Sequence, residues 1–454
     1  MIGDTLVNAA EIMEGKLSGD DGRYLGVSTD TRTLRPEQLF FALQGPNFDG
    51  GAFVEQAGKV GAAGAVVRVP VKSRIPLIRV ADTRRALGKL AATWRRQLSV
   101  TVIGLTGSNG KTTLKALIAN CLSNVAATTA TRGNLNNDIG VPLTLAEIGL
   151  EHRFAVVEMG ANHAGEIAWL TSLSEPDLVV ITNAAPAHLE GFGSIAGVAR
   201  AKGEILQGSP RPRGAILNAD DAYLPLWRSM AADLDITTFG LGQAAHVRAV
   251  GIETHDAGSD FTLLLHGREL PVSLRLPGRH NVVNACAAAA VAAALEVDDA
   301  SIRDGLEATE PVAGRLNPLP AASGASIYDD SYNANPASVV AAAEFIAAKR
   351  GESWLVLGDM GELGSDSEKL HREVGESARK VGVSRLFATG PLMRYAVDAF
   401  GVRGAWFDSV EALIDALRRS LTSDVSVLVK GSRATHMERV VHALRNDNPA
   451  RRRA

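Results

Sequence analysis

From Thr101 onward, short continuous apolar runs alternate with stretches of helical spacing, and this alternation limits the chain to few folds. The apolar runs include "TVIGLTG", "FAVVEMG", "DLVVITN" and "GAILNAD". Strands that are apolar on both faces and joined by helices are typical of a parallel sheet covered by helices on both sides. The sequence therefore predicts an α/β fold.

The length of 454 residues exceeds what one hydrophobic core organises, so we expect several domains. Residues 1–82 hold short β-type runs between turns and predict a small N-terminal α/β domain. Residues 83–312 hold the parallel sheet, to which residues 246–277 append an antiparallel meander before an alanine-rich helix from about Asn281. A new strand–helix series over residues 313–454 predicts a C-terminal Rossmann-like domain.

The composition is that of a folded protein, with 46% hydrophobic and 21% charged residues. A net charge of -3 gives no reason to expect a nucleic-acid partner. The most apolar run, "ACAAAAVAAAL", is about half a membrane span, so we expect no membrane insertion. Cys121 and Cys286 lie in apolar helical patterns and are interpreted as core residues of a cytoplasmic protein. We assign no function to the basic tail "ARRRA".

The stretch "GLTGSNGKTT" lies between a predicted strand and a predicted helix and resembles a phosphate-binding P-loop. It is shorter than the common pattern, because only Ser108 and Asn109 separate Gly107 from Gly110. Backbone N–H groups at such a turn, together with the helix N-terminus, can face phosphate oxygens. The setting predicts a nucleotide site.

Side chains near this loop add to the nucleotide prediction. Lys111 would place its charge on the β- and γ-phosphates, and the Thr112 hydroxyl would reach Mg²⁺. Glu158 and His188 follow two other predicted strands, at the edge where parallel sheets bind ligands. Taken singly, a strand-end Glu or His is equally well a solvated residue. Together with the P-loop, they favour a metal site.

Three further residues carry no functional signal by themselves. Lys202, in "VARAKGEIL", lies in a helical pattern, where a lysine is normally a surface charge. Asn162 and His163 are interpreted as helix-start residues. The residues alone leave all three as structural.

Several motifs together resemble the Mur ligases, which form amide bonds during synthesis of the bacterial cell-wall precursor. The motifs are "TGSNGKTT", "VVEMG", "NAAPAHLEGFGS", "AKGEI", "GRHNVVNACAAAA", "AGRLN", "YDDSYNANP" and "LGDMGELG". The short P-loop is that superfamily's form of the motif and is shared with folylpolyglutamate synthetase. The resemblance runs over all three predicted domains, from "STDTR" to "KGSRATHMERVV".

The resemblance implies a particular activity within the family. "GNLNNDIGVPLTL" and "DDSYNANP" resemble the member that joins D-Ala-D-Ala to UDP-N-acetylmuramoyl-tripeptide (UDP-MurNAc-tripeptide). ATP would phosphorylate the terminal carboxylate of the tripeptide, and the dipeptide amine would displace phosphate from this acyl phosphate. Two Mg²⁺ ions would assist, and we expect a monomer.

The resemblance also implies roles for residues of the central and C-terminal domains. The implied catalytic residues are Lys111, His188, Lys202 and Arg315. The implied ATP-binding residues are Gly107, Ser108, Asn109, Gly110, Lys111, Thr112, Thr113, Asn281, Arg315 and Asp330. The implied metal ligands are Thr112, Glu158, His188 and Lys202, the last as a lysine carbamylated with CO₂. Asn281 could equally be a helix cap, and Asp330 a turn residue.

The substrate-binding residues follow from the same resemblance. The implied UDP-substrate contacts are Ser28, Thr29, Asp30, Arg32, Asn134, Asn136 and Asn137, although an asparagine-rich loop is otherwise merely a turn. The candidates for the dipeptide are Asn333 and Asn335. One departure concerns Gly51, which stands where family members commonly have His, and it puts one first-domain contact in doubt.

Three alternatives remain open at this level. A Mur ligase that adds diaminopimelate or lysine is the nearest, but its Asp-Asn-Pro-Arg-type motif is replaced by "DMGELG". Folylpolyglutamate synthetase would leave the "STDTR" domain unexplained. A P-loop switch that only binds partners would need no third nucleotide-fold domain. We also expect residues 309–316 to act as a hinge between the second and third domains.

Overall fold

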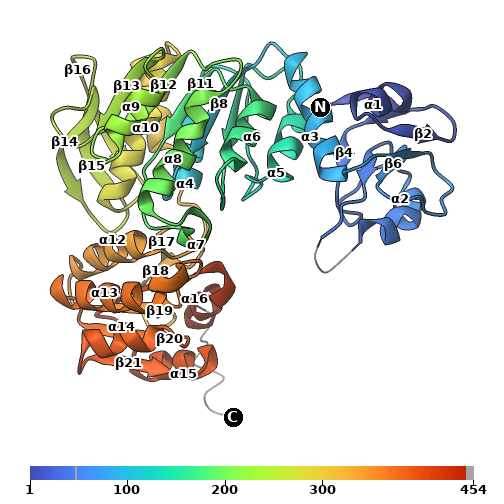
Figure 1. The fold of residues 1–454 in the computed structure, drawn as a ribbon. Coiled ribbons are helices and arrows are strands. Elements are labelled where there is room, and N and C mark those ends of the chain that lie inside the picture. Colours follow the sequence, from blue (N-terminus) through green and yellow to red (C-terminus); the bar gives the residue numbers. More distant parts are fainter. Residues whose placement is uncertain (46–48, 446–454) are drawn as a thin grey trace.

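The computed structural model describes residues 1–45 and 49–445, and the basic tail "ARRRA" lies outside them. The described residues form four sheets with helices packed around them, which confirms the α/β prediction. Figure 1 shows three bodies: the N-terminal one lies to one side of the central one, and the C-terminal one lies below it. The proposed boundaries at residues 82 and 312 fall between the sheets.

The N-terminal body contains a two-stranded sheet, β1-β3, and a five-stranded sheet of order β2-β7-β6-β5-β4. Its strands are β1 (Gly3–Thr5), β2 (Lys16–Ser18), β3 (Arg23–Leu25), β4 (Val27–Ser28), β5 (Leu39–Phe41), β6 (Gly64–Val67) and β7 (Leu77–Arg79). The helices α1 (Leu6–Ile12) and α2 (Val54–Val60) pack on these sheets. These elements form two core clusters, one of which extends to Leu87, Leu90 and Ala146 beyond the N-terminal body.

The helix α3 (Thr83–Arg96) connects the N-terminal and central bodies. It begins where the Asp82 carboxylate accepts hydrogen bonds from two backbone N–H groups of the first turn, a standard N-cap. Leu87 and Leu90 pack in the N-terminal core, whereas Ala91 and Ala92 pack in the central core. One helix therefore belongs to both cores and fixes the junction.

The central sheet has nine strands in the order β16-β15-β14-β13-β12-β11-β8-β10-β9. The strands are β8 (Thr101–Thr106), β9 (Thr128–Ala130), β10 (Phe154–Glu158), β11 (Leu178–Ile181), β12 (Gly214–Asn218), β13 (Asp235–Gly240), β14 (Val247–Thr254), β15 (Ser259–Leu265) and β16 (Arg268–Leu274). Pairing is parallel from β9 to β14 and antiparallel from β14 to β16. The parallel sheet and its appended meander are both confirmed.

Helices cover both faces of the central sheet and make two core clusters. They are α4 (Lys111–Ser123), α5 (Gly140–Glu147), α6 (Glu166–Ser174), α7 (Leu189–Phe192), α8 (Ile195–Gly203), α9 (Leu224–Met230), α10 (Arg279–Ala294) and α11 (Asp299–Glu307). The small side chains of the alanine-rich α10 let it pack closely on α4. Cys121 and Cys286 are both buried in this cluster as free thiols, as predicted.

The C-terminal body is a six-stranded sheet of order β17-β18-β22-β19-β20-β21, parallel except for β17. Its strands are β17 (Asn317–Pro320), β18 (Ser326–Asp330), β19 (Glu352–Gly358), β20 (Arg385–Thr389), β21 (Gly404–Phe407) and β22 (Val425–Lys430). Its helices are α12 (Pro336–Ala347), α13 (Ser367–Lys380), α14 (Met393–Phe400), α15 (Val410–Ser420) and α16 (Glu438–Arg445). The Rossmann-like prediction agrees with this arrangement.

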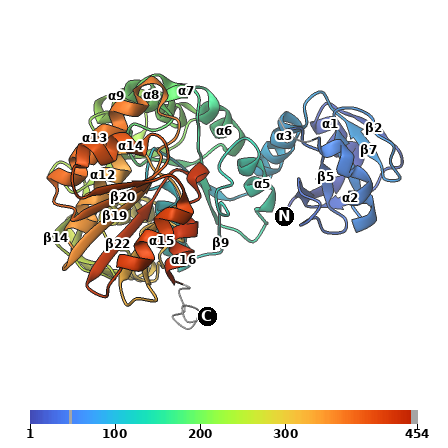
Figure 2. The same ribbon diagram turned by 90° about the horizontal axis from the view of Figure 1, so that it is seen from below.

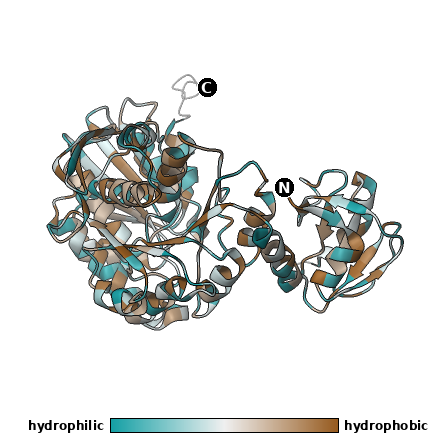
Figure 3. Ribbon diagram, turned by 90° about the horizontal axis from the view of Figure 1, so that it is seen from above, coloured by the Kyte–Doolittle hydropathy of each residue, from teal (hydrophilic) through white to brown (hydrophobic). Residues whose placement is uncertain are grey.

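The central and C-terminal bodies lie close together, while the N-terminal body stands apart on the α3 and α5 side (Figure 2). Hydrophobic and hydrophilic stretches alternate along the outer helices, as expected for helices that cover a sheet on one side only (Figure 3). Among the described residues, no helix combines the length and apolarity that a membrane span requires.

Candidate active site

The P-loop connects β8 to α4 and needs glycine at two positions. Gly107 has a φ of 148°, and a Cβ there would lie 1.8 Å from Thr182 Oγ1. Gly110 has a φ of 82°, and a Cβ there would lie 2.6 Å from Asn284 Oδ1. Both positions therefore exclude larger residues through backbone conformation and through space.

The segment that follows β11 supports the P-loop from one side. The backbone N–H of Asn109 donates to Asn183 Oδ1 at 3.0 Å, and Thr182 Oγ1 donates to the Asn109 carbonyl at 2.7 Å. Ser108 Oγ accepts from the Ala185 N–H at 3.0 Å. Because β11 and β10 flank β8, the loops after these strands meet the P-loop at the carboxyl edge of the sheet.

Lys111 is the first residue of α4 and is partly buried, rather than lying in the loop ahead of the helix. Its ammonium donates to the Gly107 carbonyl at 2.7 Å. Desolvation by the surrounding protein lowers the pKa of Lys111 to about 8, even though Glu158 opposes this change. An anionic ligand at this position would favour the charged form of the lysine.

Glu158 ends β10, and its carboxylate is almost fully buried. Oε1 accepts from Asn136 Nδ2 at 2.8 Å and from Thr112 Oγ1 at 3.3 Å, while Oε2 lies 3.1 Å from the Lys115 ammonium. Burial opposes ionisation, but Lys115 and Lys111 outweigh it and hold the pKa of Glu158 below its usual value. The carboxylate is therefore an anion at neutral pH.

His188 precedes α7 and adopts a left-handed φ of 53°, which is uncommon for a residue with a side chain. Its Nδ1 forms an ion-pair contact with Glu362 Oε2 of the C-terminal body. This contact leaves Nε2 as the second ring nitrogen that a ligand could use. The predicted metal-binding histidine thus lies where the two larger bodies meet.

Lys202 lies on α8 and is buried, so its interpretation as a surface charge is wrong. Among the described residues its ammonium makes no hydrogen bond or ion pair, and it lies 5.4 Å from the centroid of the Phe192 ring. Burial, with Lys111 nearby, lowers the pKa of Lys202 to about 7. Lys202 is therefore buried next to the Phe192 ring, a position that its local sequence alone does not indicate.

Arg315 lies in the connection between α11 and β17 and spans the two larger bodies. Its guanidinium lies 4.0 Å from the centroid of the Tyr332 ring, a cation–π contact. Its Nη2 lies 3.4 Å from Thr112 Oγ1 on the P-loop helix. The connection thus carries a cation from the C-terminal side to the predicted phosphate site.

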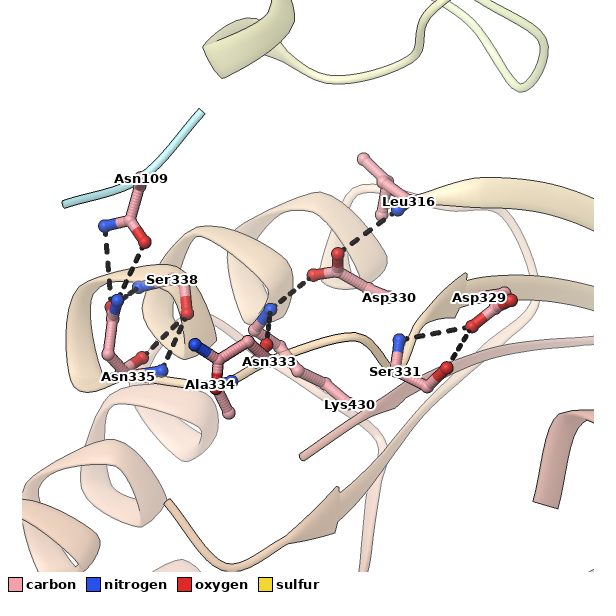
Figure 4. A network of polar contacts seen from close by, with 10 residues as sticks. All are labelled: Asn109, Leu316, Asp329, Asp330, Ser331, Asn333, Ala334, Asn335, Ser338 and Lys430. Atoms are coloured by element: carbon pink, nitrogen blue, oxygen red, sulfur yellow. Dashed lines mark hydrogen bonds and ion pairs between the residues drawn. The ribbon is translucent and has the colours of Figure 1, made fainter. Parts of the chain in front are cut away.

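Asp330 ends β18 and is held by two contacts (Figure 4). Oδ2 pairs with the Lys430 ammonium at 2.7 Å, and Oδ1 accepts from the Leu316 N–H at 3.2 Å. Lys430 also donates to the Asn333 carbonyl at 2.8 Å, and its side chain is only 4% exposed. The predicted ribose contact therefore also neutralises a buried lysine.

Asn335 serves as the N-cap of α12 and reaches the P-loop (Figure 4). Its Oδ1 accepts from the Ser338 N–H at 3.0 Å, and its Nδ2 donates to Asn109 Oδ1 at 2.7 Å. Asn333 Oδ1 accepts from the N–H of Ala334 at 2.9 Å. Both predicted dipeptide residues lie at the mouth of the C-terminal sheet, as the sequence indicated.

A single cavity of about 1060 Å³ joins most of the predicted residues. The predicted residues that line it are Ser108, Asn109, Gly110, Lys111, Thr113, Asn134, Asn136, Asn137, Glu158, His188, Asn281, Arg315, Asp330, Asn333 and Asn335. Gly107, Thr112 and Lys202 lie outside its lining, although Thr112 contacts Glu158 and Arg315.

The residues predicted for the first domain do not reach this cavity. Ser28 ends β4, and Thr29, Asp30 and Arg32 follow it in a turn. The Arg32 guanidinium pairs with the Asp30 carboxylate at 2.6 Å on the surface. Gly51, the position of the departure from the family pattern, lies in a short 3₁₀ helix, Gly50–Phe53.

The structure refines two helix starts. Asn162 and His163 precede α6, whose N-cap is Gly165, so the prediction that they begin the helix is wrong by a few residues. Asn281 lies inside the first turn of α10, and its Nδ2 donates to the Pro277 carbonyl at 2.8 Å. Asn162 lines the cavity together with Asn281.

Several residues of the site were missed by sequence reasoning: Lys115, Asn183, Asn284, Tyr332, Glu362 and Lys430. Lys115 lies four residues after Lys111, so the helical period places the two on one face, and this spacing was the available signal. Lys430 ends β22 and Glu362 lies in the segment after β19, so both lie at strand ends, the same signal that identified Glu158. The others carry no local signal that distinguishes them from loop or core residues.

Comparison with known proteins assigns the class. Residues 105–292 match the Mur ligase middle domain, and residues 314–433 match the Mur ligase, glutamate ligase domain. The chain is 43% identical over 450 residues to the UDP-N-acetylmuramoyl-tripeptide–D-alanyl-D-alanine ligase of Escherichia coli K12, covering 98% of this chain and 99% of that protein. The chain belongs to the Mur ligase family.

Solved structures give the same result over all three bodies. MurF from Acinetobacter baumannii superposes with a TM-score of 0.91 at 36% identity, covering 98% of this chain and 99% of that one. The MurF ligase from Thermotoga maritima, solved in complex with ADP, superposes with a TM-score of 0.82 at 25% identity and covers 94% and 98%. Similarity at this coverage includes the N-terminal body.

Proposed function

We propose that this Mur ligase uses ATP to join D-Ala-D-Ala to UDP-MurNAc-tripeptide through an acyl phosphate, a step of peptidoglycan precursor synthesis in the cytoplasm. The observation that carries the proposal is the single cavity in which the P-loop, the asparagine-rich loop and the first strand-end of the C-terminal sheet meet. A ligase must bring a nucleotide, a carboxylate and an amine to one place. The residues proposed to bind the nucleotide, the muramoyl side of the tripeptide substrate and the dipeptide all line this one cavity, which supports the proposal. The Escherichia coli relative is named for the addition of D-alanyl-D-alanine to UDP-N-acetylmuramoyl-tripeptide.

The main barrier to the reaction is the charge repulsion between the anionic carboxylate and the γ-phosphate. Cationic side chains of this chain would reduce that repulsion. Lys111, at the start of α4, would pair with the phosphates, and Arg315 would approach them from the junction of the two bodies. Fixed cations placed in advance stabilise developing charge without reorganisation during the reaction. Closure of the C-terminal body over the P-loop would exclude water from the reacting groups.

The donor set at Glu158 fits Mg²⁺. The metal commonly binds nucleotide sites through one or two carboxylates together with phosphate oxygens. Glu158 Oε1 and Thr112 Oγ1 lie 3.3 Å apart, and His188 offers one free ring nitrogen. When bound, Mg²⁺ supplies charge neutralisation at the phosphates.

Lys202 fits the proposed carbamylation. A neutral amine forms a bond to the carbon of CO₂ and releases a proton, which leaves a carbamate anion. The lysine is buried beside Phe192 without an anionic partner in contact, and its pKa of about 7 makes the neutral amine accessible at neutral pH. The modification would replace a poorly solvated cation by an anion.

The assay that tests the proposal is ADP release by the purified protein with each substrate alone and with both. We expect ADP release only when UDP-MurNAc-tripeptide and D-Ala-D-Ala are both present, and loss of turnover in Lys111→Ala. Lys59→Ala, which removes an exposed lysine of the N-terminal body, is the matched control and should retain activity. Turnover with diaminopimelate or lysine in place of the dipeptide would instead support the alternative family member.

A further inference from the structure

The two oxygens of the Glu158 carboxylate have different surroundings. Oε1 is the one that contacts Thr112 Oγ1 and Asn136 Nδ2. Oε2 is buried and accepts no hydrogen bond within the described residues; its contact is the ion pair with the Lys115 ammonium at 3.1 Å. The carboxylate therefore presents one oxygen toward the nucleotide side and turns the other toward a cation.

Lys115 is held in place by its surroundings. Its side chain is 8% exposed, and its ammonium also donates to the Gly133 carbonyl at 2.9 Å. It lies one helical turn after Lys111 on α4, so the helix fixes its position relative to the P-loop. A cation anchored on two sides cannot turn away from Oε2 without leaving a buried carboxylate unpaired, which is strongly unfavourable.

We propose that Lys115 is a positioning residue that restricts Glu158 to one metal-facing oxygen and thereby favours Mg²⁺ over Ca²⁺. Ca²⁺ accepts six to eight oxygen ligands, including both oxygens of one carboxylate, whereas Mg²⁺ demands a smaller octahedral shell. With Oε2 occupied by Lys115, Glu158 can serve a cation only through Oε1. This inference rests on the proposed nucleotide and metal site.

The test measures binding of a non-hydrolysable ATP analogue to the full-length protein by calorimetry, with Mg²⁺ or Ca²⁺ as the only divalent cation. The quantity compared is the ratio of the two dissociation constants, because removal of a positive charge strengthens binding of either cation. In Lys115→Met we expect the preference for Mg²⁺ to fall at least fivefold. Lys115→Arg keeps the charge and should retain most of the preference.

Lys349→Met is the matched control. Lys349 is buried to a similar degree, with 9% exposure, and pairs with Asp256 at 2.9 Å away from the cavity lining. Its removal should lower the melting temperature without changing the cation ratio. If Lys115→Met does not fold, Lys115→Gln carries the same measurement.

An unchanged cation ratio in the folded Lys115 variant, with only a lower melting temperature, would overturn the inference and leave Lys115 as a structural ion pair. Wild-type protein whose nucleotide binding ignores both cations would overturn the proposed metal site as well. The two failures are therefore distinguishable.

Discussion

Asn335 on the C-terminal body donates a hydrogen bond from Nδ2 to Oδ1 of Asn109 in the P-loop, at 2.7 Å. The same side chain caps α12 through Oδ1, so its orientation is fixed by the helix that it begins. The contact ties the arrangement of two bodies to the conformation of the nucleotide loop. We therefore expect substitution of Asn335 to change nucleotide affinity, independently of any contact with the dipeptide.

Asn335→Asp keeps the cap acceptor and removes the donor to Asn109. We expect the melting temperature to stay near that of the wild type, while affinity for the ATP analogue falls about fivefold, the value of one net hydrogen bond of ~1 kcal/mol. Asn109→Ala should give the same loss. If Asn335→Asp instead raises only the KM for D-Ala-D-Ala, and Asn109→Ala does not, the residue is a dipeptide contact and the bridge is incidental.

Gly110→Ala and Gly165→Ala form a matched pair. Both glycines have a similar left-handed φ, 82° and 85°, so both substitutions carry a conformational penalty of about 1–2 kcal/mol. A Cβ at Gly165 meets nothing within 4 Å, whereas a Cβ at Gly110 collides with Asn284. We expect Gly165→Ala to bind the ATP analogue normally and Gly110→Ala to lose binding, as measured by calorimetry. Equal affinities would show that the close approach at Asn284 relaxes freely.

The strands and the P-loop were predictable because their signals are local. The apolar runs around β8, β10 and β11 carry their burial in a few residues, and Gly107 and Gly110 lie at a strand-to-helix turn that the pattern marks. The same reasoning placed Glu158 and His188 at the rim. Here elementary periodicity and the topology of parallel sheets were sufficient.

The remaining features depend on contacts between distant segments. Asn109 and Asn335 are separated by 226 positions in the chain. The sequence around either residue does not predict that the two are in contact. The burial of Lys202 results from the way α8 packs in the central body. From sequence alone, a lysine in a helical pattern is predicted to lie on the exposed face of the helix. The family resemblance implied carbamylation of Lys202, which the spacing of residues in the sequence does not indicate. It implied no role for Lys115.

Lys202→Ala should be nearly inactive and partly rescued by acetate or formate, because the proposed carbamate would place a carboxylate-like group, rather than an ammonium, beside the metal. Lys202→Glu should retain more activity than Lys202→Ala. Carbamylation needs the neutral amine, and burial lowers the pKa of Lys202 to about 7, so the carbamate should be lost as pH falls through that value. A ¹³CO₂-derived carbamate signal, present in the wild type at pH 8 and absent in Lys202→Ala, checks the modification. Full activity of Lys202→Ala would show that Lys202 takes no part in the reaction.

Asp330 forms an observed ion pair with Lys430 and is proposed to contact the ATP ribose, and a single substitution would not separate these two contributions. Its carboxylate pairs with Lys430, whose side chain is only 4% exposed, so Asp330→Ala leaves a buried charge unpaired and should destabilise the protein by about 3 kcal/mol. The double variant Asp330→Ala/Lys430→Met removes both charges and should recover much of that stability. Urea unfolding of the single and double variants measures this difference.

The proposed ribose contact of Asp330 is tested separately, by measuring nucleotide affinity. If Asp330 holds the ribose, the double variant should bind the ATP analogue about tenfold more weakly than the Lys430→Met single variant, since a hydrogen bond to a charged group contributes about 1.5 kcal/mol or more. Small-angle scattering should also show less compaction on addition of the analogue and UDP-MurNAc-tripeptide, because closure across residues 309–316 would lose a contact on the C-terminal side. Equal affinity and equal compaction in these two variants would leave Asp330 as the counter-ion of Lys430. The contacts between the C-terminal side and the P-loop region that then remain in the argument are those of Arg315 and Asn335.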